Sequence, residues 1–501
     1  MNLRQLLENL SKATVSGPLD QEVTGVFTDS RQVISGSVFI AVRGSESDGQ
    51  KFVADALEKG ACSIVSEVAP EASLDASICW AHVPFARAAA SSLACRWNGQ
   101  PSASMKIVGI TGTNGKTTTA FIVHSIMQKV WTRAGLLGTV QVDDGEEVTA
   151  ATHTTPGPIE LQSILRQMVD NDCRGVAMEI SSHALEQQRT DGVELDAAVF
   201  TNFSQDHLDY HGDMETYFDA KRRLFVLLET QDGKKKTNAV INMDDPHGQR
   251  LIEEFKGKLH MVTFGRGVHA DLRVGREKQT VRGTEFEVRY KERDYLVRTP
   301  YIGRFNVDNC AAALAACLAV GVRPRDAVRA LADAPQVPGR MENVGVRDGA
   351  TVFVDYAHTP DALKNACAAL RELKPRRLIT VFGCGGDRDR TKRPLMGKAA
   401  YEGSDLCIIT SDNPRSENPI SIIQDIEKGM DGKRYQSIPD RMLAIQVAVN
   451  TSEEGDVILI AGKGHETYQE ISGNRIEFDD RRAGYKALNM KVIKAPEEDE
   501  S

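Results

Sequence analysis

Residues 106–119 read KIVGITGTNGKTTT. The apolar run 107–110 predicts a buried strand, and the stretch 112–115, which has a glycine at each end, predicts a tight turn. Lys116 and Thr117 then open a helical segment. A chain that passes from a strand through a glycine turn into a helix aims several backbone N–H groups and the positive helix end at one point. That point suits a phosphate group.

The side chains of this loop fit a nucleotide and its metal ion. Lys116 would neutralise the β- and γ-phosphate charge, and the Thr117 hydroxyl would bind Mg²⁺. The strict pattern G-x-x-x-x-G-K-[ST] requires glycine at position 110 and meets Ile110, so the loop is a variant. A glycine turn with an incidental lysine is the alternative, which the flanking strand and helix disfavour. The residues of this loop predicted to bind ATP are Gly112, Thr113, Asn114, Gly115, Lys116, Thr117 and Thr118.

Length and composition indicate a multidomain soluble protein. The chain has 501 residues, enough for about three compact domains. Its 41% apolar and 26% charged residues are ordinary for a globular enzyme. The formal net charge of −9 argues against nucleic acid or an anionic membrane as a main partner. The longest apolar run, 310–322, is too short to span a bilayer, and the nine cysteines form no C-x-x-C pair. We expect a cytoplasmic monomer without stable membrane association.

Three α/β domains are predicted. Residues 1–104 would form a small N-terminal domain, 105–334 the central domain around the phosphate loop, and 335–501 the C-terminal domain. In the first domain, the loop 28–31 (Thr-Asp-Ser-Arg) could present hydroxyls and a guanidinium to a ligand. Such a loop is more often a plain turn, so the ligand role needs further support.

Two further loops of the central domain carry candidate metal ligands. Glu179 ends the apolar run 175–178, and a carboxylate at the end of a second strand is where phosphate-loop proteins hold Mg²⁺, directly or through water. We therefore favour a metal role for Glu179 over that of a strand-end charge. The cluster 206–211 combines His and Asp and fits a second cation site or a solvated loop equally well. Lys221 lies on a predicted amphipathic helix, and the chemistry of the sequence alone gives no reason to choose it.

The C-terminal domain repeats one theme four times, a buried strand followed by a polar or glycine-rich loop. The four loops are 355–360, 383–390, 410–415 and 461–466. Strands that are apolar throughout, interleaved with helical segments, predict a doubly wound parallel sheet whose carboxyl ends share one rim. That rim is rich in Arg and Asp and suits a zwitterionic amino acid, whereas a surface salt-bridge network is the less favoured alternative.

Together these parts predict an enzyme with two substrates that uses ATP. In the economical chemistry, a substrate carboxylate attacks the γ-phosphate of ATP, and an amine then attacks the acyl phosphate. Such an enzyme mainly positions its substrates and neutralises charge. Hydrolysis of ATP alone would not need the second rim.

The motifs occur in the order found in the Mur ligase family, which the chain resembles over nearly its whole length. They are GITGTNGKTTT, the loop His153-Thr154-Thr155-Pro156, EISSHALEQQR, NFSQDHLDYH, the helix of Lys221, GRFNVDN, DYAHTPDAL, GCGGDRDRTKRPLM, SDNPR and GKGHE. The resemblance implies an N-terminal UDP-binding domain, a central ATPase domain and a C-terminal Rossmann-like domain for an amino acid. It also implies an ATP-dependent ligase of peptidoglycan precursor synthesis, which adds meso-diaminopimelate to UDP-N-acetylmuramoyl-L-alanyl-D-glutamate, here called the UDP-muramoyl dipeptide.

The resemblance assigns roles to individual residues. Positions that hold the UDP-muramoyl dipeptide are matched by Thr28, Ser30, Thr154, Thr155, Ser181, Gln187 and Arg189. Nucleotide positions outside the loop are matched by Asn309, Arg340 and Asp355. Lys116, Glu179, His207 and Lys221 match catalytic positions, and the last three, with Thr117, match metal positions. In the family the lysine matching Lys221 is carbamylated by CO₂, which creates a hard oxygen ligand for a second Mg²⁺.

The Asp-Asn-Pro-Arg loop at 412–415 points to the amino acid. Diaminopimelate positions are matched by Arg388, Asp412, Asn413, Pro414, Arg415, Gly462 and Glu466. Diaminopimelate has one more carboxylate than lysine, and an unpaired Arg415 facing lysine would cost on the order of a few kcal/mol. Another amide ligase, such as a folylpolyglutamate synthase or a different Mur enzyme, would keep the phosphate loop without this tetrapeptide. A non-enzymatic ATP switch would bind ATP without releasing phosphate when an amine is added.

Overall fold

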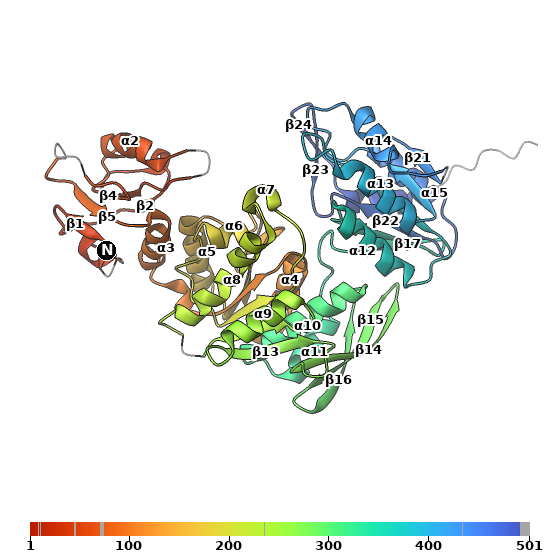
Figure 1. Ribbon diagram of the computed structural model, residues 1–501, viewed down its shortest axis with the longest axis horizontal. Helices are drawn as coiled ribbons and strands as arrows, with labels where there is room; N and C mark the ends of the chain where they lie inside the picture. Colours follow the sequence, from red (N-terminus) through yellow and green to blue (C-terminus); the bar gives the residue numbers. More distant parts are fainter. Residues whose placement is uncertain are drawn as a thin grey trace, which may run out of the picture. The chain divides into compact units, whose positions relative to one another are not determined.

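The computed structural model describes residues 1–8, 10, 12–44, 47–70, 75–234, 236–432 and 434–490 (Figure 1). Contacts within the chain divide it into two compact units. The first consists of Met1–Gly275, Val288–Tyr295 and Asp308–Leu331, and the second of Arg276–Glu287, Leu296–Val307 and the chain from Ala332 onward. The predicted domain boundaries at 104 and 334 stay predictions.

The N-terminal part of the first unit is a five-stranded sheet in the order β1-β5-β4-β3-β2, in which only β1 is antiparallel to its neighbour. Its elements are α1 (Leu3–Leu7), β1 (Thr14–Ser16), β2 (Val26–Phe27), β3 (Val38–Ile40), α2 (Val53–Glu58), β4 (Ser63–Ser66), β5 (Cys79–His82) and α3 (Ala86–Trp97). Alternate residues of β3 serve two cores: Val38 and Ile40 pack in the cluster with α1 and α3, and Phe39 packs with α2. Both faces are therefore covered, as expected for a small α/β domain.

The central sheet of the first unit places β6 (Lys106–Thr111) between β11 and β10, and the strands from β13 to β7 are parallel. The other strands are β7 (Ala134–Leu137), β8 (Gln141–Asp143), β9 (Val148–Ala150), β10 (Gly175–Glu179), β11 (Ala197–Phe200), β12 (Asn238–Asn242) and β13 (His260–Gly265). The helices are α4 (Lys116–Trp131), α5 (Pro158–Asp170), α6 (Ser182–Glu186), α7 (Leu208–His211), α8 (Met214–Thr230), α9 (Pro246–Phe255), α10 (Arg304–Ala319) and α11 (Pro324–Ala332). The predicted strand, turn and helix around residues 106–119 are confirmed as β6, its loop and α4.

Three strands that the sequence analysis did not predict follow β13. They are β14 (Leu272–Thr280), β15 (Gly283–Tyr290) and β16 (Arg293–Thr299), and their residues are divided between the two units. In β15 every second residue from Thr284 to Val288 is buried, which is the pattern of a strand with one covered face.

The sheet of the second unit has the order β17-β18-β22-β19-β20-β21, and all neighbours are parallel except the edge pair β17 and β18. Its strands are β17 (Glu342–Arg347), β18 (Ala350–Asp355), β19 (Leu378–Phe382), β20 (Leu406–Ile409), β21 (Tyr435–Ser437) and β22 (Val457–Ala461), followed by a hairpin of β23 (Tyr468–Ile471) and β24 (Asn474–Glu477). Its helices are α12 (Pro360–Arg371), α13 (Lys392–Gly403), α14 (Pro419–Glu427), α15 (Arg441–Asn450) and α16 (Asp480–Asn489).

Helices cover both faces of this second sheet. Phe353 of β18 packs in the cluster that contains α12, α13 and α14, whereas Val352 and Val354 pack with α15 and α16. This alternation confirms the predicted doubly wound sheet, and the four predicted loops all leave the carboxyl ends of its strands. Among the helices of the described ranges, none has the length and apolar character needed to cross a membrane.

Candidate functional site

The phosphate loop depends on two glycines in left-handed backbone conformations. Gly112 has φ of 147° and Gly115 has φ of 84°. A Cβ atom at 112 would lie 1.9 Å from Thr201 Oγ1, and one at 115 would lie 2.2 Å from Asn309 Oδ1. Only glycine fits both the conformation and the space. Asn309, a predicted nucleotide residue, is thereby shown to lie against the loop.

Lys116 begins α4 and folds back over the loop. Its Nζ donates hydrogen bonds to the carbonyl oxygens of Gly112 and Thr113, each at 2.9 Å. Lys221 Nζ donates to the same Gly112 oxygen at 2.8 Å. The side chains of Lys116 and Lys221 therefore converge on the Gly112 carbonyl oxygen.

Glu179, at the end of β10, is fully buried and receives several hydrogen bonds. The Thr117 hydroxyl donates to Glu179 Oε2 at 2.9 Å. Thr139 donates twice, from its hydroxyl to Oε2 at 3.0 Å and from its backbone N–H to Oε1 at 2.8 Å. Sequence analysis linked Thr117 with Glu179 correctly but missed Thr139. The available signal was a hydroxyl residue shortly after the apolar run 134–137, which the sequence analysis did not predict as a strand and which forms β7.

Lys221 lies on α8 with only 1% of its surface exposed. Its Nζ is 4.3 Å from the centre of the Tyr217 ring. Burial, followed by the charge of Lys116, holds the pKa of Lys221 well below its ordinary value. The amine is therefore available as a nucleophile. Its helical phase could have revealed it, because Lys221 lies four residues from both Tyr217 and Phe225 on the buried face of α8.

His207 precedes α7 in a left-handed conformation with φ of 51°. Its Nε2 lies 3.6 Å from Asp206 Oδ2, and its side chain is 45% exposed. Desolvation lowers the pKa of His207. The Asp206 carboxylate opposes this shift, whereas the charges of Lys116 and Lys221 add to it, so His207 is within electrostatic reach of both lysines.

The oxygen ligands at the start of α4 and the end of β10 fit Mg²⁺. Thr117 and Glu179 offer hard oxygen ligands. Within the described ranges, no group of three or more His, Cys, Asp or Glu side chains could hold a metal ion by itself. Mg²⁺ commonly uses one or two carboxylates and completes its shell with phosphate oxygens and waters. These residues thus suit an ion that binds together with a nucleotide.

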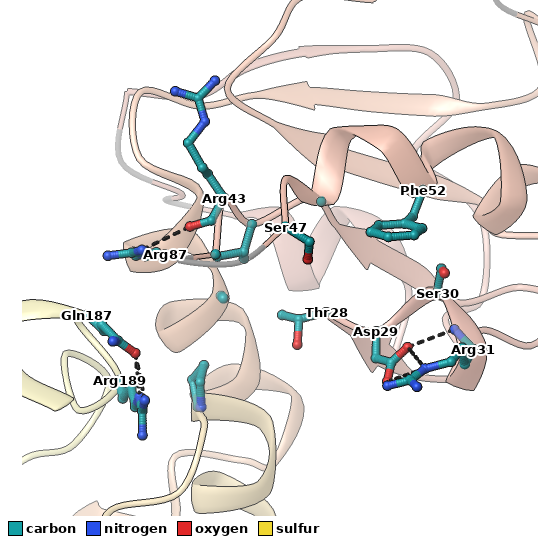
Figure 2. Close-up of a pocket in the computed structure, with 15 residues that line it drawn as sticks. Thr28, Asp29, Ser30, Arg31, Arg43, Ser47, Phe52, Arg87, Gln187 and Arg189 are labelled. Carbon is teal, nitrogen blue, oxygen red and sulfur yellow. Dashed lines mark hydrogen bonds and ion pairs between the residues drawn. The ribbon is translucent and has the colours of Figure 1, made fainter. Parts of the chain in front are cut away.

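A cavity of about 640 Å³ lies elsewhere in the first unit (Figure 2). Figure 2 shows Thr28 between Gln187 and Arg189 on one side and the Asp29–Arg31 ion pair on the other. Residues of the N-terminal sheet and of the segment after α6 therefore line one space. Its lining is Thr28, Asp29, Ser30, Arg31, Val42, Arg43, Gly44, Ser47, Gly49, Phe52, Arg87, Ala90, Pro158, Gln187 and Arg189.

The structure joins four predicted substrate residues in this cavity, namely Thr28, Ser30, Gln187 and Arg189. Sequence analysis missed Arg87, whose guanidinium donates to the Arg43 carbonyl at 2.9 Å. An isolated arginine gave no signal for it in the sequence, and the structure places it on α3.

Hydrogen bonds continue from this cavity to Glu179. Arg189 donates to the Thr155 carbonyl at 2.8 Å, and the Thr155 hydroxyl donates to the Glu179 carbonyl at 2.9 Å. The hydroxyls of Thr154 and Thr139 lie 3.0 Å apart. Ser181 caps α6 by accepting a hydrogen bond from the Ala184 N–H. Five of the predicted dipeptide residues therefore form one hydrogen-bonded set with Glu179, namely Thr154, Thr155, Ser181, Gln187 and Arg189.

The rim of the second unit brings together the loops after β20 and β22. Asn413 Nδ2 donates to Glu466 Oε2 at 2.9 Å. Gly462 has φ of 117°, and a Cβ there would lie 2.7 Å from Asp412 Oδ2. The shared rim is confirmed for these loops.

Arg415 is fixed by neighbours on both sides. Its backbone takes φ of 51°, its N–H donates to the Glu470 carbonyl at 3.0 Å, and its carbonyl accepts from the Ser472 N–H at 2.6 Å. Its guanidinium donates to the Gly386 carbonyl at 2.7 Å and has Glu470 Oε2 at 3.8 Å from Nε. The hairpin of β23 and β24 thus positions the arginine, with Pro414 preceding it and Arg388 exposed on the loop after β19.

Arg340 and Asp355 lie on the first part of the second unit. The Arg340 guanidinium stacks on the Tyr356 ring at 4.6 Å. Asp355 Oδ2 accepts from the Met341 N–H at 2.7 Å, and burial raises the pKa of Asp355. The two predicted nucleotide residues therefore share one neighbourhood within this unit.

Comparisons with known proteins cover almost the entire chain. The models described as "Mur ligase family, catalytic domain", "Mur ligase middle domain" and "Mur ligase, glutamate ligase domain" match residues 22–96, 110–317 and 339–464. A UDP-N-acetylmuramoyl-L-alanyl-D-glutamate–2,6-diaminopimelate ligase from Syntrophomonas wolfei is 40% identical over 98% of this chain and 100% of its own length. The ligase of the same name from Geobacillus kaustophilus is 43% identical with the same coverage.

Solved structures show the same similarity. One with the same ligase name has a TM-score of 0.73 and 33% identity, covering 97% of this chain and 98% of its own. The MurF ligase from Thermotoga maritima, solved in complex with ADP, has a TM-score of 0.60, covering 92% of this chain and 96% of its own. At 20% identity this second similarity concerns the fold.

Proposed function

This chain belongs to the Mur ligase family, and on that premise we propose that it is an ATP-dependent amide ligase that adds meso-diaminopimelate to the UDP-muramoyl dipeptide. The observation that carries the proposal is the end-to-end match with ligases named for this reaction, together with an intact Asp412–Arg415 loop. The product is a precursor of peptidoglycan.

The reaction forms one amide bond in two steps, activation of a carboxylate and attack by an amine. The D-glutamyl carboxylate of the dipeptide attacks the γ-phosphorus of ATP, ADP leaves, and an acyl phosphate results. An amine of diaminopimelate then attacks the acyl carbon, and inorganic phosphate leaves as the amide forms. The protein contributes mainly position and positive charge to both steps.

The phosphate loop, Lys116 and Asn309 of the first unit would bind the nucleotide and its phosphates. The glycine conformations of the loop and the Lys116 side chain that folds over it support this role. For Arg340 and Asp355 of the second unit, the nucleotide role rests on the family resemblance alone. Thr117, Glu179 and His207 would hold Mg²⁺, which supplies charge neutralisation to the phosphates. Lys221 would carry a CO₂-derived carbamate, and its buried, readily deprotonated amine supports this modification.

The cavity of the first unit would bind the UDP-muramoyl dipeptide. Its volume of about 640 Å³ suits a large ligand. Thr28 and Ser30 offer hydroxyls for the uridine nucleotide, and Arg189 and Arg87 offer positive charge. Thr154, Thr155, Ser181 and Gln187 would contact the remainder.

The rim of the second unit would bind diaminopimelate. Arg415, 23% exposed at its side chain, would pair with the carboxylate that lysine lacks. Asp412, Asn413 and Glu466 would contact the same amino-acid end, with Arg388, Pro414 and Gly462 around them. Because Glu470 lies 3.8 Å from Arg415, a ligand carboxylate must compete with it.

The first experiment measures phosphate release from ATP and Mg²⁺ with the UDP-muramoyl dipeptide, comparing meso-diaminopimelate with L-lysine and identifying the product by mass. Turnover with diaminopimelate is expected. Preference for lysine would keep the ligase and remove the specificity argument. Lack of turnover with either amine would contradict the proposed function and direct the assay to folates and other muramyl precursors.

Arg415→Ala tests the specificity residue. We expect loss of most diaminopimelate-dependent activity, while the affinity for ATP stays near that of the protein without the substitution. Arg482→Ala is the matched control, because Arg482 is 77% exposed and pairs only with Glu477 in the second unit among the ion pairs of the described residues. Equal loss of ATP binding and diaminopimelate turnover in Arg415→Ala would rule out the specificity role.

A further inference from the structure

Lys463 places a buried ammonium directly beneath the rim. It follows β22, and its side chain is 0% exposed. Its Nζ donates to Asn413 Oδ1 at 3.0 Å and to Glu466 Oε2 at 3.1 Å. An ammonium taken out of water is costly unless its partners compensate for the lost hydration. The positions of Asn413 and Glu466 are thus tied to that of the lysine.

This arrangement permits one orientation of the Asn413 amide. Oδ1 accepts from Lys463 Nζ and also from the Glu470 backbone N–H at 3.1 Å. Nδ2 donates to Glu466 Oε2 at 2.9 Å. A rotation of the amide by 180° would set its N–H groups against two donors and its oxygen against a carboxylate. Lys463, together with the Glu470 N–H and the Glu466 carboxylate, therefore fixes which side of Asn413 is a donor.

The network leaves a complementary pair of groups for a ligand. Within the described ranges, the hydrogen bonds of this network use Oε2 of Glu466 and one proton of Asn413 Nδ2. Glu466 Oε1 and the second Nδ2 proton remain, and the Glu466 side chain is 21% exposed. A negative acceptor next to an N–H donor complements the ammonium and carboxylate of an amino-acid end.

We propose that Lys463 is a positioning residue for the amino-acid substrate, which holds Asn413 as a hydrogen-bond donor and Glu466 as an ammonium acceptor. The inference rests on the proposed function, because it specifies how the same rim recognises diaminopimelate. Lys463 acts through Asn413 and Glu466 and need not touch the ligand. Its loss should thus affect one substrate selectively.

The test compares three variants in steady-state assays. Lys463→Met keeps an unbranched, buried side chain but removes every donor, whereas Lys463→Gln keeps N–H donors without the charge. For Lys463→Met we expect a rise of about tenfold or more in KM for meso-diaminopimelate, because two hydrogen bonds from a charged donor are lost. KM for ATP and for the UDP-muramoyl dipeptide should stay within about twofold, because the hydrogen bonds of Lys463 go only to residues of the rim, which is proposed to bind diaminopimelate. Lys463→Gln should recover part of the loss, and Lys398→Met, at a 64% exposed lysine, should change nothing.

A double-mutant cycle separates positioning from general destabilisation. Because Lys463 acts partly through Asn413, the loss of kcat/KM for diaminopimelate in the variant carrying both Lys463→Met and Asn413→Ala should be clearly smaller than the product of the two single losses. Independent, multiplicative losses would overturn the proposal, as would an equal rise in KM for all three substrates. If Lys463→Met does not fold by circular dichroism, Lys463→Gln takes its place in the same cycle.

The protein without substitutions tests the proposed ligase activity separately from the role of Lys463. Absence of turnover in that protein contradicts the proposed ligase. Normal turnover with an unchanged diaminopimelate KM in the Lys463 variants contradicts only the role of Lys463.

Discussion

Arg441 and Asp480 form an ion pair in which both side chains are fully buried. Two hydrogen bonds of 2.7 Å join the guanidinium to the carboxylate. The same guanidinium donates to the carbonyls of Ser411 and Ala461, at 3.2 and 2.9 Å. These are the last residues before Asp412 and Gly462, so the pair anchors both rim loops from below.

Arg441→Met should strongly destabilise the second unit. The substitution leaves the Asp480 carboxylate buried without its partner, at a cost of about 3–5 kcal/mol. Urea unfolding followed by circular dichroism measures this loss. Adding Asp480→Leu should recover much of it, since no charge then remains buried. A loss below about 1 kcal/mol in the single variant would show that water reaches Asp480.

Site residues could be predicted from the sequence where a single local pattern determined the structure around them. Lys116 and Thr117 follow from the order of strand, turn and helix within a few positions. Thr139 and Lys463 did not follow, because each has a partner that is distant in sequence: Thr139 is 40 residues from Glu179, and Lys463 is 50 from Asn413, although its other partner, Glu466, is near. Their roles arise only when the sheets bring separate loops to one edge.

At the scale of elements, Arg393 joins α13 to the segment that begins α14. Its side chain is fully buried and bonds to both Glu417 oxygens, at 2.7 and 3.0 Å. Hydrogen bonds from Arg393, and then from the Asp387 N–H, lower the pKa of Glu417 to about 2. A carboxyl with a lowered pKa in the folded state stabilises that state above its ordinary pKa.

This linkage predicts that the second unit loses stability in acid. As pH falls from about 5 towards 2, the unfolded chain binds a proton at Glu417 before the folded chain does, so stability decreases across that range. In Arg393→Met the melting temperature should be lower at pH 7 and should decline less between pH 5 and pH 3. Melting curves at several pH values test this, with Arg482→Ala as the surface control. If the melting temperature of Arg393→Met declined between pH 5 and pH 3 as much as that of the protein without substitutions, the loss of stability in acid would come from other carboxyl groups.

Several strands of uniform apolar composition were predicted, although the apolar runs of β7, β12 and β13 were passed over, and β14, β15 and β16 were not predicted. The strands of the parallel sheets are buried on both faces and read as continuous apolar runs. In β15, charged residues such as Glu285 and Glu287 alternate with buried ones, which hides the strand unless a period of two is sought. The antiparallel edge strand β17 is similarly mixed and also escaped prediction.

For the whole molecule, the two proposed ligand regions belong to different units. The UDP-muramoyl dipeptide alone should therefore slow amide exchange near 28–31 and 187–189, and leave 412–415 and 462–466 unchanged. A ligand at 100 times its Kd adds about 2.7 kcal/mol to the stability of the state it binds. Hydrogen exchange with mass spectrometry measures this protection. Meso-diaminopimelate alone should protect only the second set, and protection of the rim by the nucleotide sugar would contradict this division.

The hydrogen bonds of Thr139 and Thr154 beside Glu179 also determine which hydroxyl group is the donor in each contact. A hydroxyl has one proton, and that of Thr139 is committed to Glu179 Oε2. The 3.0 Å contact between Thr139 and Thr154 must then be donated by Thr154. Thr154 consequently has no proton left for a ligand and can only accept. We therefore expect Thr154 to accept from an amide N–H of the dipeptide rather than to contact a carboxylate or phosphate oxygen. The chain of Glu179, Thr139 and Thr154 thus determines which kind of ligand group can bind there, as well as where it binds.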